Sequence, residues 1–152
     1  YHLAFSLSRL NRPEEAIQHY QRTLEIFPDY AEARINLGNL FMNQGSFQEA
    51  EKAFRLALEV APELASVHNN LGTLLGRQGR VVEAIPLFVV AVRLDPQYIQ
   101  ALCNLGNAYL SQGRNQEAAT QFSLALAIRP DFPPAIGGMQ RARLRIDSDK
   151  TP

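Results

Sequence analysis

Two columns of polar side chains recur along this sequence at a constant spacing of 34 residues. The first column holds asparagine each time, and the second, three residues further along, holds two asparagines and a threonine. The columns are Asn36, Asn70 and Asn104, and Asn39, Thr73 and Asn107. A side-chain amide carries both N–H donors and a carbonyl acceptor, as a peptide backbone does. The chemistry that this spacing favours is therefore repeated hydrogen bonding.

No grouping of residues predicts catalysis. The chain has one cysteine, Cys103, and its histidines are scattered (His2, His19, His68), so no metal-ligand spacing is present. There is no glycine-rich phosphate loop, and no serine with histidine and acid at a recognised spacing. His68 is expected to be structural, and Cys103 has no evident activating base. We therefore predict a segment without enzymatic activity, cofactor or metal ion.

Composition limits the partners and the location. Fifteen basic residues balance fifteen acidic ones, so the positive charge needed for sequence-independent binding to nucleic acid is missing. The longest apolar run, residues 87–92, is far shorter than the roughly 20 residues that span a bilayer. We expect neither nucleic-acid binding nor membrane insertion. An intracellular, cytoplasmic location is favoured, and a chain beginning at Tyr1 is expected to be part of a longer polypeptide.

Other columns keep the same period and predict two helices in each unit. The pattern is helical from Ala31 to Gln44, is interrupted at Gly45, resumes near Phe47 and ends at Pro62. Glycine suits the position just after a helix, and proline cannot continue one. The supporting columns are Pro28, Pro62, Pro96 and Pro130; Ala16, Ala50, Ala84 and Ala118; Tyr20, Phe54, Phe88 and Phe122; Gly38, Gly72 and Gly106; and Gly45, Gly79 and Gly113, with Asn11 as the fourth member.

The helical wheel separates packing residues from the asparagines. At 100° per residue, Leu37, Gly38 and Phe41 fall on one side of the first helix, which we interpret as the packed face. Gly38 would let the neighbouring helix approach closely. Asn36 and Asn39 fall on the opposite side, so we expect them to face outward.

Leu-Gly, an aromatic residue or leucine three positions on, then Ala, Phe and Pro at a 34-residue period resemble the tetratricopeptide repeat. The resemblance implies an all-α fold: a right-handed α-α superhelix (solenoid) of about four helix-turn-helix repeats plus a C-terminal capping helix. The tryptophan position of the family holds Arg34, His68 and Leu102. The expected boundaries are a single domain over 1–146, with units at about 1–30, 31–64, 65–98 and 99–132, a capping helix at about 133–146 and a flexible tail at 147–152.

In this family the first helices line the concave side of the superhelix. The resemblance therefore implies that the two polar columns (Asn36, Asn39, Asn70, Thr73, Asn104 and Asn107), which we call the asparagine ladder, form a peptide-binding groove. First helices about 10 Å apart would meet an extended peptide at about every third residue, because such a peptide rises roughly 3.3 Å per residue. The ladder is similar to that of the repeat arm of the O-linked N-acetylglucosamine (O-GlcNAc) transferase.

Several alternatives stay open at this stage. The amides could bond to the next repeat and serve the fold alone. The favoured function is a non-catalytic protein-protein interaction module, a scaffold or adaptor that binds an extended peptide or partner protein. One alternative is the substrate-recognition arm of a larger enzyme such as an O-GlcNAc-type glycosyltransferase, and another is a scaffold that self-associates through its repeat ends.

The family resemblance also suggests roles for further side chains on the first helices. Candidates for apolar groove contacts are Ile35, Met42, Cys103 and Leu110. The columns that would need lysine or arginine to clamp an acidic chaperone terminus hold Glu32, Ser66 and Gln100, and Ile35, Asn69 and Cys103. We do not expect such a clamp. The arginines of the capping helix (Arg141, Arg143, Arg145) are expected to form a solvated surface.

Overall fold

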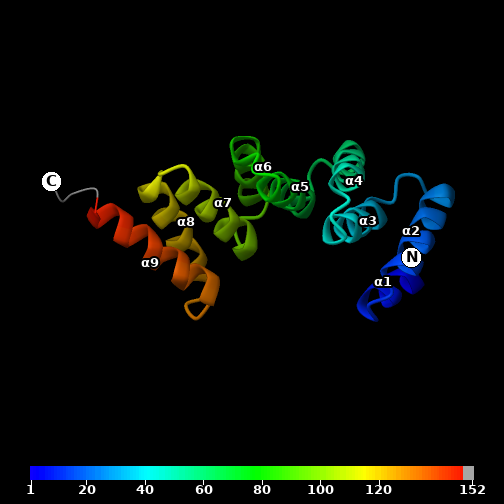
Figure 1. The fold of residues 1–152 in the computed structure, drawn as a ribbon, viewed down its shortest axis with the longest axis horizontal. Coiled ribbons are helices and arrows are strands. Elements are labelled where there is room, and N and C mark those ends of the chain that lie inside the picture. Colours follow the sequence, from blue (N-terminus) through cyan, green and yellow to red (C-terminus); the bar gives the residue numbers. More distant parts are fainter. Residues whose placement is uncertain (149–152) are drawn as a thin grey trace. The chain divides into compact units, whose positions relative to one another are not determined.

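A computed structural model describes residues 1–148 as an all-α fold. The chain divides into two compact units, Tyr1–Leu74 and Leu75 onward, each of which is described by itself (Figure 1). The helices of the described residues are α1 (His2–Arg9), α2 (Pro13–Ile26), α3 (Ala31–Asn43), α4 (Phe47–Val60), α5 (Ala65–Arg77), α6 (Val81–Leu94), α7 (Ile99–Ser111), α8 (Asn115–Ile128) and α9 (Pro133–Ser148).

The helices of each unit pack as sequential pairs. In the first unit α1 packs on α2, α2 on α3 and α3 on α4, around a core that includes Ala4, Ala16, Tyr20 and Leu37. In the second unit α6 packs on α7, and α7, α8 and α9 contact one another. The all-α, helix-pair fold predicted from the period is confirmed.

The ends of the helices follow the sequence closely. α3 and α4 begin at the predicted residues and end one or two residues before the predicted stops. α9 begins at Pro133 as expected but continues to Ser148, so it includes two residues assigned to the tail. Residues 149–152 of that tail lie outside the described residues.

Left-handed backbone separates the two helices of each repeat. Gly45 has a φ of 79°, a conformation that costs glycine little because it has no Cβ. Asn11 has a φ of 57° at the equivalent position of the first repeat, and asparagine tolerates this region better than most residues. Asn11 therefore takes the place of the glycine, as predicted. The other members of the column are Gly79 (φ 78°) and Gly113 (φ 72°).

A glycine of the first helix receives an aromatic ring of the second. A Cβ added to Gly38 would lie 2.6 Å from Phe54 Cε1, and one added to Gly106 would lie 2.7 Å from Phe122 Cζ. Both phenylalanines are fully buried. Burying such a ring contributes on the order of 2 kcal/mol, and only glycine leaves room for it. The Leu-Gly pair is thus explained by packing.

The position of the family tryptophan has a structural role in this chain too. Arg34 donates from Nε and Nη2 to the carbonyl oxygen of Pro28, at 3.0 and 2.6 Å. His68 places Nε2 2.7 Å from the carbonyl oxygen of Pro62, six residues before it. Two different polar side chains therefore hold the equivalent loop against the first helix. Leu102 instead is fully buried.

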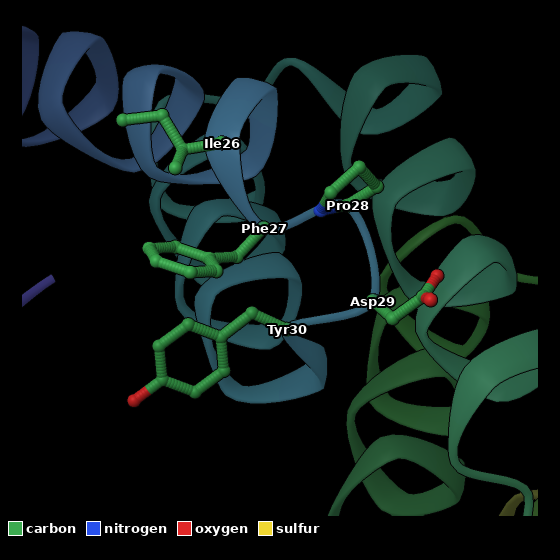
Figure 2. A pocket seen from close by; sticks show the side chains of 5 residues that line it. All are labelled: Ile26, Phe27, Pro28, Asp29 and Tyr30. Atoms are coloured by element: carbon green, nitrogen blue, oxygen red, sulfur yellow. The ribbon is translucent and has the colours of Figure 1, made fainter.

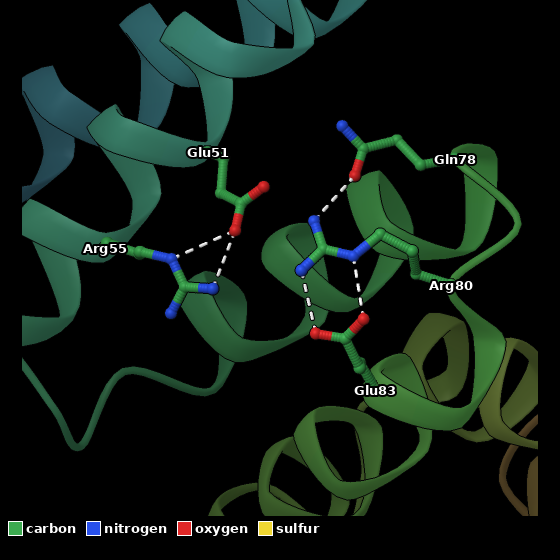
Figure 3. Close-up of polar contacts among 5 residues, drawn as sticks. All are labelled: Glu51, Arg55, Gln78, Arg80 and Glu83. Carbon is green, nitrogen blue, oxygen red and sulfur yellow. Dashed lines mark hydrogen bonds and ion pairs between the residues drawn. The ribbon is translucent and has the colours of Figure 1, made fainter.

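Exposed ion pairs mark the surface of the second helices. In the second unit Arg80 forms a bidentate pair with Glu83, at 2.8 and 2.7 Å, and also donates to Gln78 (Figure 3). In the first unit Arg55 pairs with Glu51 one turn away (Figure 3). Such surface pairs typically contribute 0 to about 1 kcal/mol each, so they are not what holds the fold together.

The glycine-ring contact predicts opposite effects at two helical glycines. Gly106→Ala should lower the free energy of unfolding by about 1–3 kcal/mol, because the new methyl group overlaps the Phe122 ring. Gly76→Ala is the control, since nothing lies within 4 Å of an added Cβ there, and it should be neutral or stabilise by up to about 1 kcal/mol. Urea denaturation measures both. Equal effects at the two sites would show that the ring contact is not the cause.

Candidate functional site

The ladder residues of the first unit are joined to one another. Asn70 on α5 donates from Nδ2 to Oδ1 of Asn39 on α3, at 3.1 Å. Asn36 on α3 donates from Nδ2 to the hydroxyl of Tyr1, which precedes α1, at 3.1 Å. All three asparagines are half-buried. The amides therefore link consecutive first helices. This agrees with the alternative that they bond to a neighbouring repeat and serve the fold.

Thr73 differs from the asparagines of its column. Its hydroxyl donates to the carbonyl oxygen of Asn69, one turn earlier in α5, at 2.8 Å. Asn69 itself is buried and donates from Nδ2 to Oδ1 of Asn70, at 3.3 Å. The threonine is thus turned toward its own helix.

In the second unit an arginine of α9 donates a hydrogen bond to a ladder residue. Asn104 on α7 is half-buried, whereas Asn107 is exposed. Arg141 on α9 donates from Nη2 to Oδ1 of Asn107, at 3.0 Å, and Arg145 donates to the carbonyl oxygen of Leu110, at 2.6 Å. These two arginines hold α9 against α7. Both arginines are exposed, as expected, and the contacts with α7 are an additional role that the sequence did not indicate.

The two asparagines of the second column leave their amide donors available. The guanidinium of Arg141 can only donate, so it fixes the amide of Asn107 with the oxygen toward the arginine and the two N–H groups elsewhere. Asn39 likewise accepts through its oxygen. Among the residues that the structure describes, Nδ2 of Asn39 and of Asn107 makes no hydrogen bond. These N–H groups are the ones that a bound chain could use.

The four side chains expected to make apolar groove contacts are buried instead. Ile35 is 8% exposed, Met42 9%, Cys103 4% and Leu110 5%. Neighbouring helices cover these side chains, so they belong to the core and offer almost no surface to a ligand. The sequence pattern did not show that these helices are packed on more than one side.

An aromatic group in the first unit was not identified from the sequence. The ring of Tyr1 lies 4.8 Å from that of Tyr30 and 5.9 Å from that of Tyr20, between centroids. Desolvation, followed by the proximity of Tyr1 and Glu32, raises the pKa of Tyr30. The tyrosines pack the start of α1 onto the loop between α2 and α3, which positions the hydroxyl that Asn36 contacts.

That loop also borders an open hollow of about 510 Å³ (Figure 2). Phe27 is 60% exposed there. The equivalent positions of the other repeats hold Ala61, Asp95 and Arg129, so packing within the repeat does not require an aromatic residue. An aromatic residue at a position that is small or charged in the other repeats could have revealed this exposed ring from the sequence. The hollow is lined by Ile26, Phe27, Pro28, Asp29 and Tyr30.

Two negative findings apply to the part of the chain that the structure describes. Residues 1–148 contain no cluster of three or more histidine, cysteine or acidic residues that could hold a metal ion. None of the helices in this range is long and apolar enough to cross a membrane.

Sequential helix pairs with a 34-residue period define an α-helical repeat protein. The sequence matches the tetratricopeptide repeat family over residues 8–71 and again over residues 63–131. These two matches together cover most of the chain, which therefore belongs to the tetratricopeptide repeat family. The similarity of the asparagine ladder to that of the O-GlcNAc transferase stays a prediction.

Curated relatives share a short stretch with this chain. The peroxisomal targeting signal receptor of Saccharomyces cerevisiae is 50% identical over 48 residues, which is 32% of this chain and 8% of the receptor. The receptor of the same name from Candida glabrata is 48% identical over 48 residues, again 32% and 8%. The match spans less than a tenth of either receptor's length.

Solved structures share the fold over most of the chain. MamA from Desulfovibrio magneticus, from residue 41 to its end, superposes with a TM-score of 0.86 at 20% identity, covering 98% of this chain and 84% of that one. YrrB, described as a tetratricopeptide repeat protein with an unusual peptide-binding site, gives 0.73 at 23% identity, covering 97% and 89%. The first repeat domain of Spaghetti (RPAP3), bound to the HSP90 peptide SRMEEVD, gives 0.75 at 20% identity, covering 77% and 93%.

The bond between Asn39 and Asn70 predicts a coupling energy. Asn39→Ala and Asn70→Ala should each lower the free energy of unfolding by about 1 kcal/mol, and the double variant by about 1 kcal/mol less than the sum, because both single changes break the same bond. A double-mutant cycle in urea measures this. Asn43→Ala, at the exposed end of α3, is the control and should change stability by less than about 0.5 kcal/mol. Strict additivity would exclude the bond.

Cys103 should be an unreactive thiol in the folded chain. Burial raises the pKa of Cys103, so less thiolate is present at pH 8 than for a free cysteine, and the sulfur is also covered. We expect an aromatic disulfide reagent to react about a hundredfold more slowly with the native chain than with the chain in guanidinium. Equal rates would contradict the buried position.

Proposed function

We propose that this chain is a non-catalytic protein-interaction module that binds an extended peptide along its asparagine ladder. The observation that carries the proposal is found in each unit by itself: Asn39 presents N–H donors while Asn70 holds its oxygen, and Asn107 does so while Arg141 holds its oxygen. Donors preset by internal bonds can pair with peptide carbonyl oxygens with little loss of side-chain entropy. The ladder thus serves the fold through its oxygens and the ligand through its nitrogens.

Family membership and the named relatives support this proposal. YrrB and RPAP3 are each described with a bound or binding peptide, and the yeast relatives are named as receptors of a targeting signal. Side-chain amides do not distinguish one peptide sequence from another, because every residue presents a carbonyl oxygen. We infer a reader of extended backbone that tolerates many side chains.

An acidic chaperone terminus is not the ligand that we propose. The HSP90 peptide bound by RPAP3 carries two glutamates and an aspartate. In this chain Glu32, Ser66 and Gln100 occupy the first-helix positions where a carboxylate clamp would need cations. Glu32 and Gln100 are exposed, so a negative and a neutral side chain face the solvent there.

Hydrogen bonds alone are too weak for stable binding. Each contributes a net 0.5 to about 1.5 kcal/mol, whereas association costs at least about 4 kcal/mol. Phe5 on α1 supplies an apolar contact in the first unit, because it is 41% exposed and occupies the column of Asn39 one repeat earlier. We therefore expect an apolar residue of the peptide to pack on Phe5.

Aspartate substitutions separate the two roles of the ladder. In the double variant Asn39→Asp with Asn107→Asp, each side chain keeps the oxygen that accepts from Asn70 or Arg141 but loses its N–H donors. The dissociation constant for a 12-residue peptide selected from a random library should rise about tenfold, as two lost hydrogen bonds predict. Isothermal titration calorimetry measures it, with thermal unfolding as the check on folding.

The matched control makes two amide-to-acid changes away from the first helices. Gln18→Glu with Gln48→Glu alters exposed positions on α2 and α4 and should leave the dissociation constant unchanged. A scrambled version of the selected peptide should bind within about tenfold of the original if the backbone dominates recognition. Equal affinities of the aspartate variant and the control would reject the ladder as the binding site.

A further inference from the structure

Apolar side chains form a stripe along the exposed face of α6 in the second unit. At about 100° per residue, Val82, Pro86 and Val89 fall within about 60° of one another around the helix. Val82 is 73% exposed and Val89 is 42% exposed, and Pro86 is exposed as well. We call these three residues the α6 stripe. The buried side of the same helix, which includes Ala84 and Phe88, lies opposite.

The other repeats show that the fold does not require apolar residues at these positions. All nine equivalent side chains of the other second helices are polar and exposed. They are Glu14, Gln18 and Gln21 in α2; Gln48, Lys52 and Arg55 in α4; and Gln116, Thr120 and Ser123 in α8. α7 and α8 follow α6 in the chain, so the stripe lies on an internal repeat and not on an end where a further repeat would stack. Packing of the repeats therefore leaves the stripe unexplained, which indicates a binding surface.

Charges of opposite sign stand at the two ends of the stripe. Glu83 lies in the first turn of α6, is exposed and pairs with Arg80 (Figure 3). Arg93 lies in the last turn, in line with the stripe, and is exposed. It makes no hydrogen bond or ion pair with the described residues. A surface that complements α6 is apolar in the middle, basic opposite Glu83 and acidic opposite Arg93. A second α6, turned end for end, has this arrangement.

The spacing along the stripe is the same in both directions. The steps from Val82 to Pro86, on to Val89 and on to Arg93 are four, three and four residues. Two antiparallel α6 helices related by a twofold axis at the middle of this series therefore place Val82 opposite Arg93 of the second copy. The same axis places Pro86 opposite Val89 of the second copy. Such a self-matching surface is what a twofold interface requires, because both subunits use the same residues.

Pro86 adds a hydrogen-bond acceptor where Arg93 of the second copy arrives. Proline has no N–H, so the carbonyl oxygen of Val82, one turn earlier, lacks its usual helical donor. A guanidinium carries several N–H donors. Arg93 of the second copy can therefore donate to this oxygen and to the carboxylate of Glu83.

We propose that two copies of this chain form a symmetric dimer through α6, with the two helices antiparallel and their stripes in contact. No other second helix of the described residues offers an apolar match, since α2, α4 and α8 are polar at the equivalent positions. α6 has 14 residues and is therefore about 21 Å long. Its contact area is smaller than the roughly 800 Å² per partner of a standard interface. We expect a reversible dimer with a dissociation constant of about 100 µM.

Sedimentation equilibrium of the full chain, from about 10 to about 500 µM, measures this dissociation constant. Val82→Gln with Val89→Arg gives α6 the side chains that α4 carries as Gln48 and Arg55, so the change is compatible with a repeat helix. This variant should raise the dissociation constant more than about tenfold. Ser123→Arg adds the same charge at the position of α8 that is equivalent to Val89, and should leave the constant unchanged. Thermal unfolding checks that each variant is folded.

Charge reversal at the two ends separates a second copy from any other occupant. In a pair of Arg93→Glu chains two glutamates meet at each end, and in a pair of Glu83→Arg chains two arginines meet. Each variant alone should therefore stay monomeric at about 500 µM. An equal mixture of the two variants places an acid opposite a base at both ends, and should form a dimer within about threefold of the original affinity. The mixture is measured in about 0.15 M salt, which screens long-range attraction between the chains.

Three results would overturn the proposal. The first is a chain that stays monomeric at about 500 µM, which would leave the stripe to a different partner. The second is a dimer that the paired stripe substitutions do not weaken, which would place the contact on another surface such as the repeat ends. The third is a failure of the mixed charge variants to associate. Because the ladder lies on the first helices, the aspartate variants of Asn39 and Asn107 should dimerise like the original chain.

Discussion

The contact between a glycine and a buried aromatic ring fixes the distance between the two helices of a repeat. Phe54 reaches Gly38, and Phe122 reaches Gly106, so closely that any other residue at the glycine would overlap the ring. In these two repeats the close approach sets how α3 and α7 are turned about their axes. Because Asn36 and Asn39 share α3 with Gly38, the same contact decides where the polar columns point. Core packing and the candidate site are thus two consequences of one geometric constraint.

Internal hydrogen bonding of the ladder is compatible with ligand binding because a side-chain amide has a carbonyl oxygen and two N–H groups, and one hydrogen bond uses only one of them. Asn39 and Asn107 each give their oxygen to a neighbour, Asn70 in one unit and Arg141 in the other. The neighbour differs while the arrangement of the asparagine is the same. A side chain held in this way has lost its rotational freedom before a ligand arrives, which lowers the entropic cost of binding. The structural role of the asparagines is therefore compatible with the proposed binding role.

Some surface positions hold a different type of residue from the equivalent positions of the other repeats. Phe27 and Phe5 place exposed aromatic rings where other repeats have small or polar residues. On α6, Val82, Pro86 and Val89 stand where the other second helices have polar side chains. In a repeat protein the columns describe what the fold requires, so the exceptions are where specific recognition can be encoded.

Much of the local structure was determined by the sequence itself. The period, the helix pairs, the turn glycines and the substitution of Asn11 for one of them follow from backbone conformation and side-chain spacing, which are local properties. The burial of Ile35, Met42, Cys103 and Leu110 was decided only by the tertiary structure, as were the bonds from Arg141 and Arg145 to α7. A helical wheel shows the directions of side chains about one axis but not how many neighbouring helices surround that axis. Burial and the pairing of distant polar groups depend on those neighbours, because they arise only when helices far apart in the sequence come together.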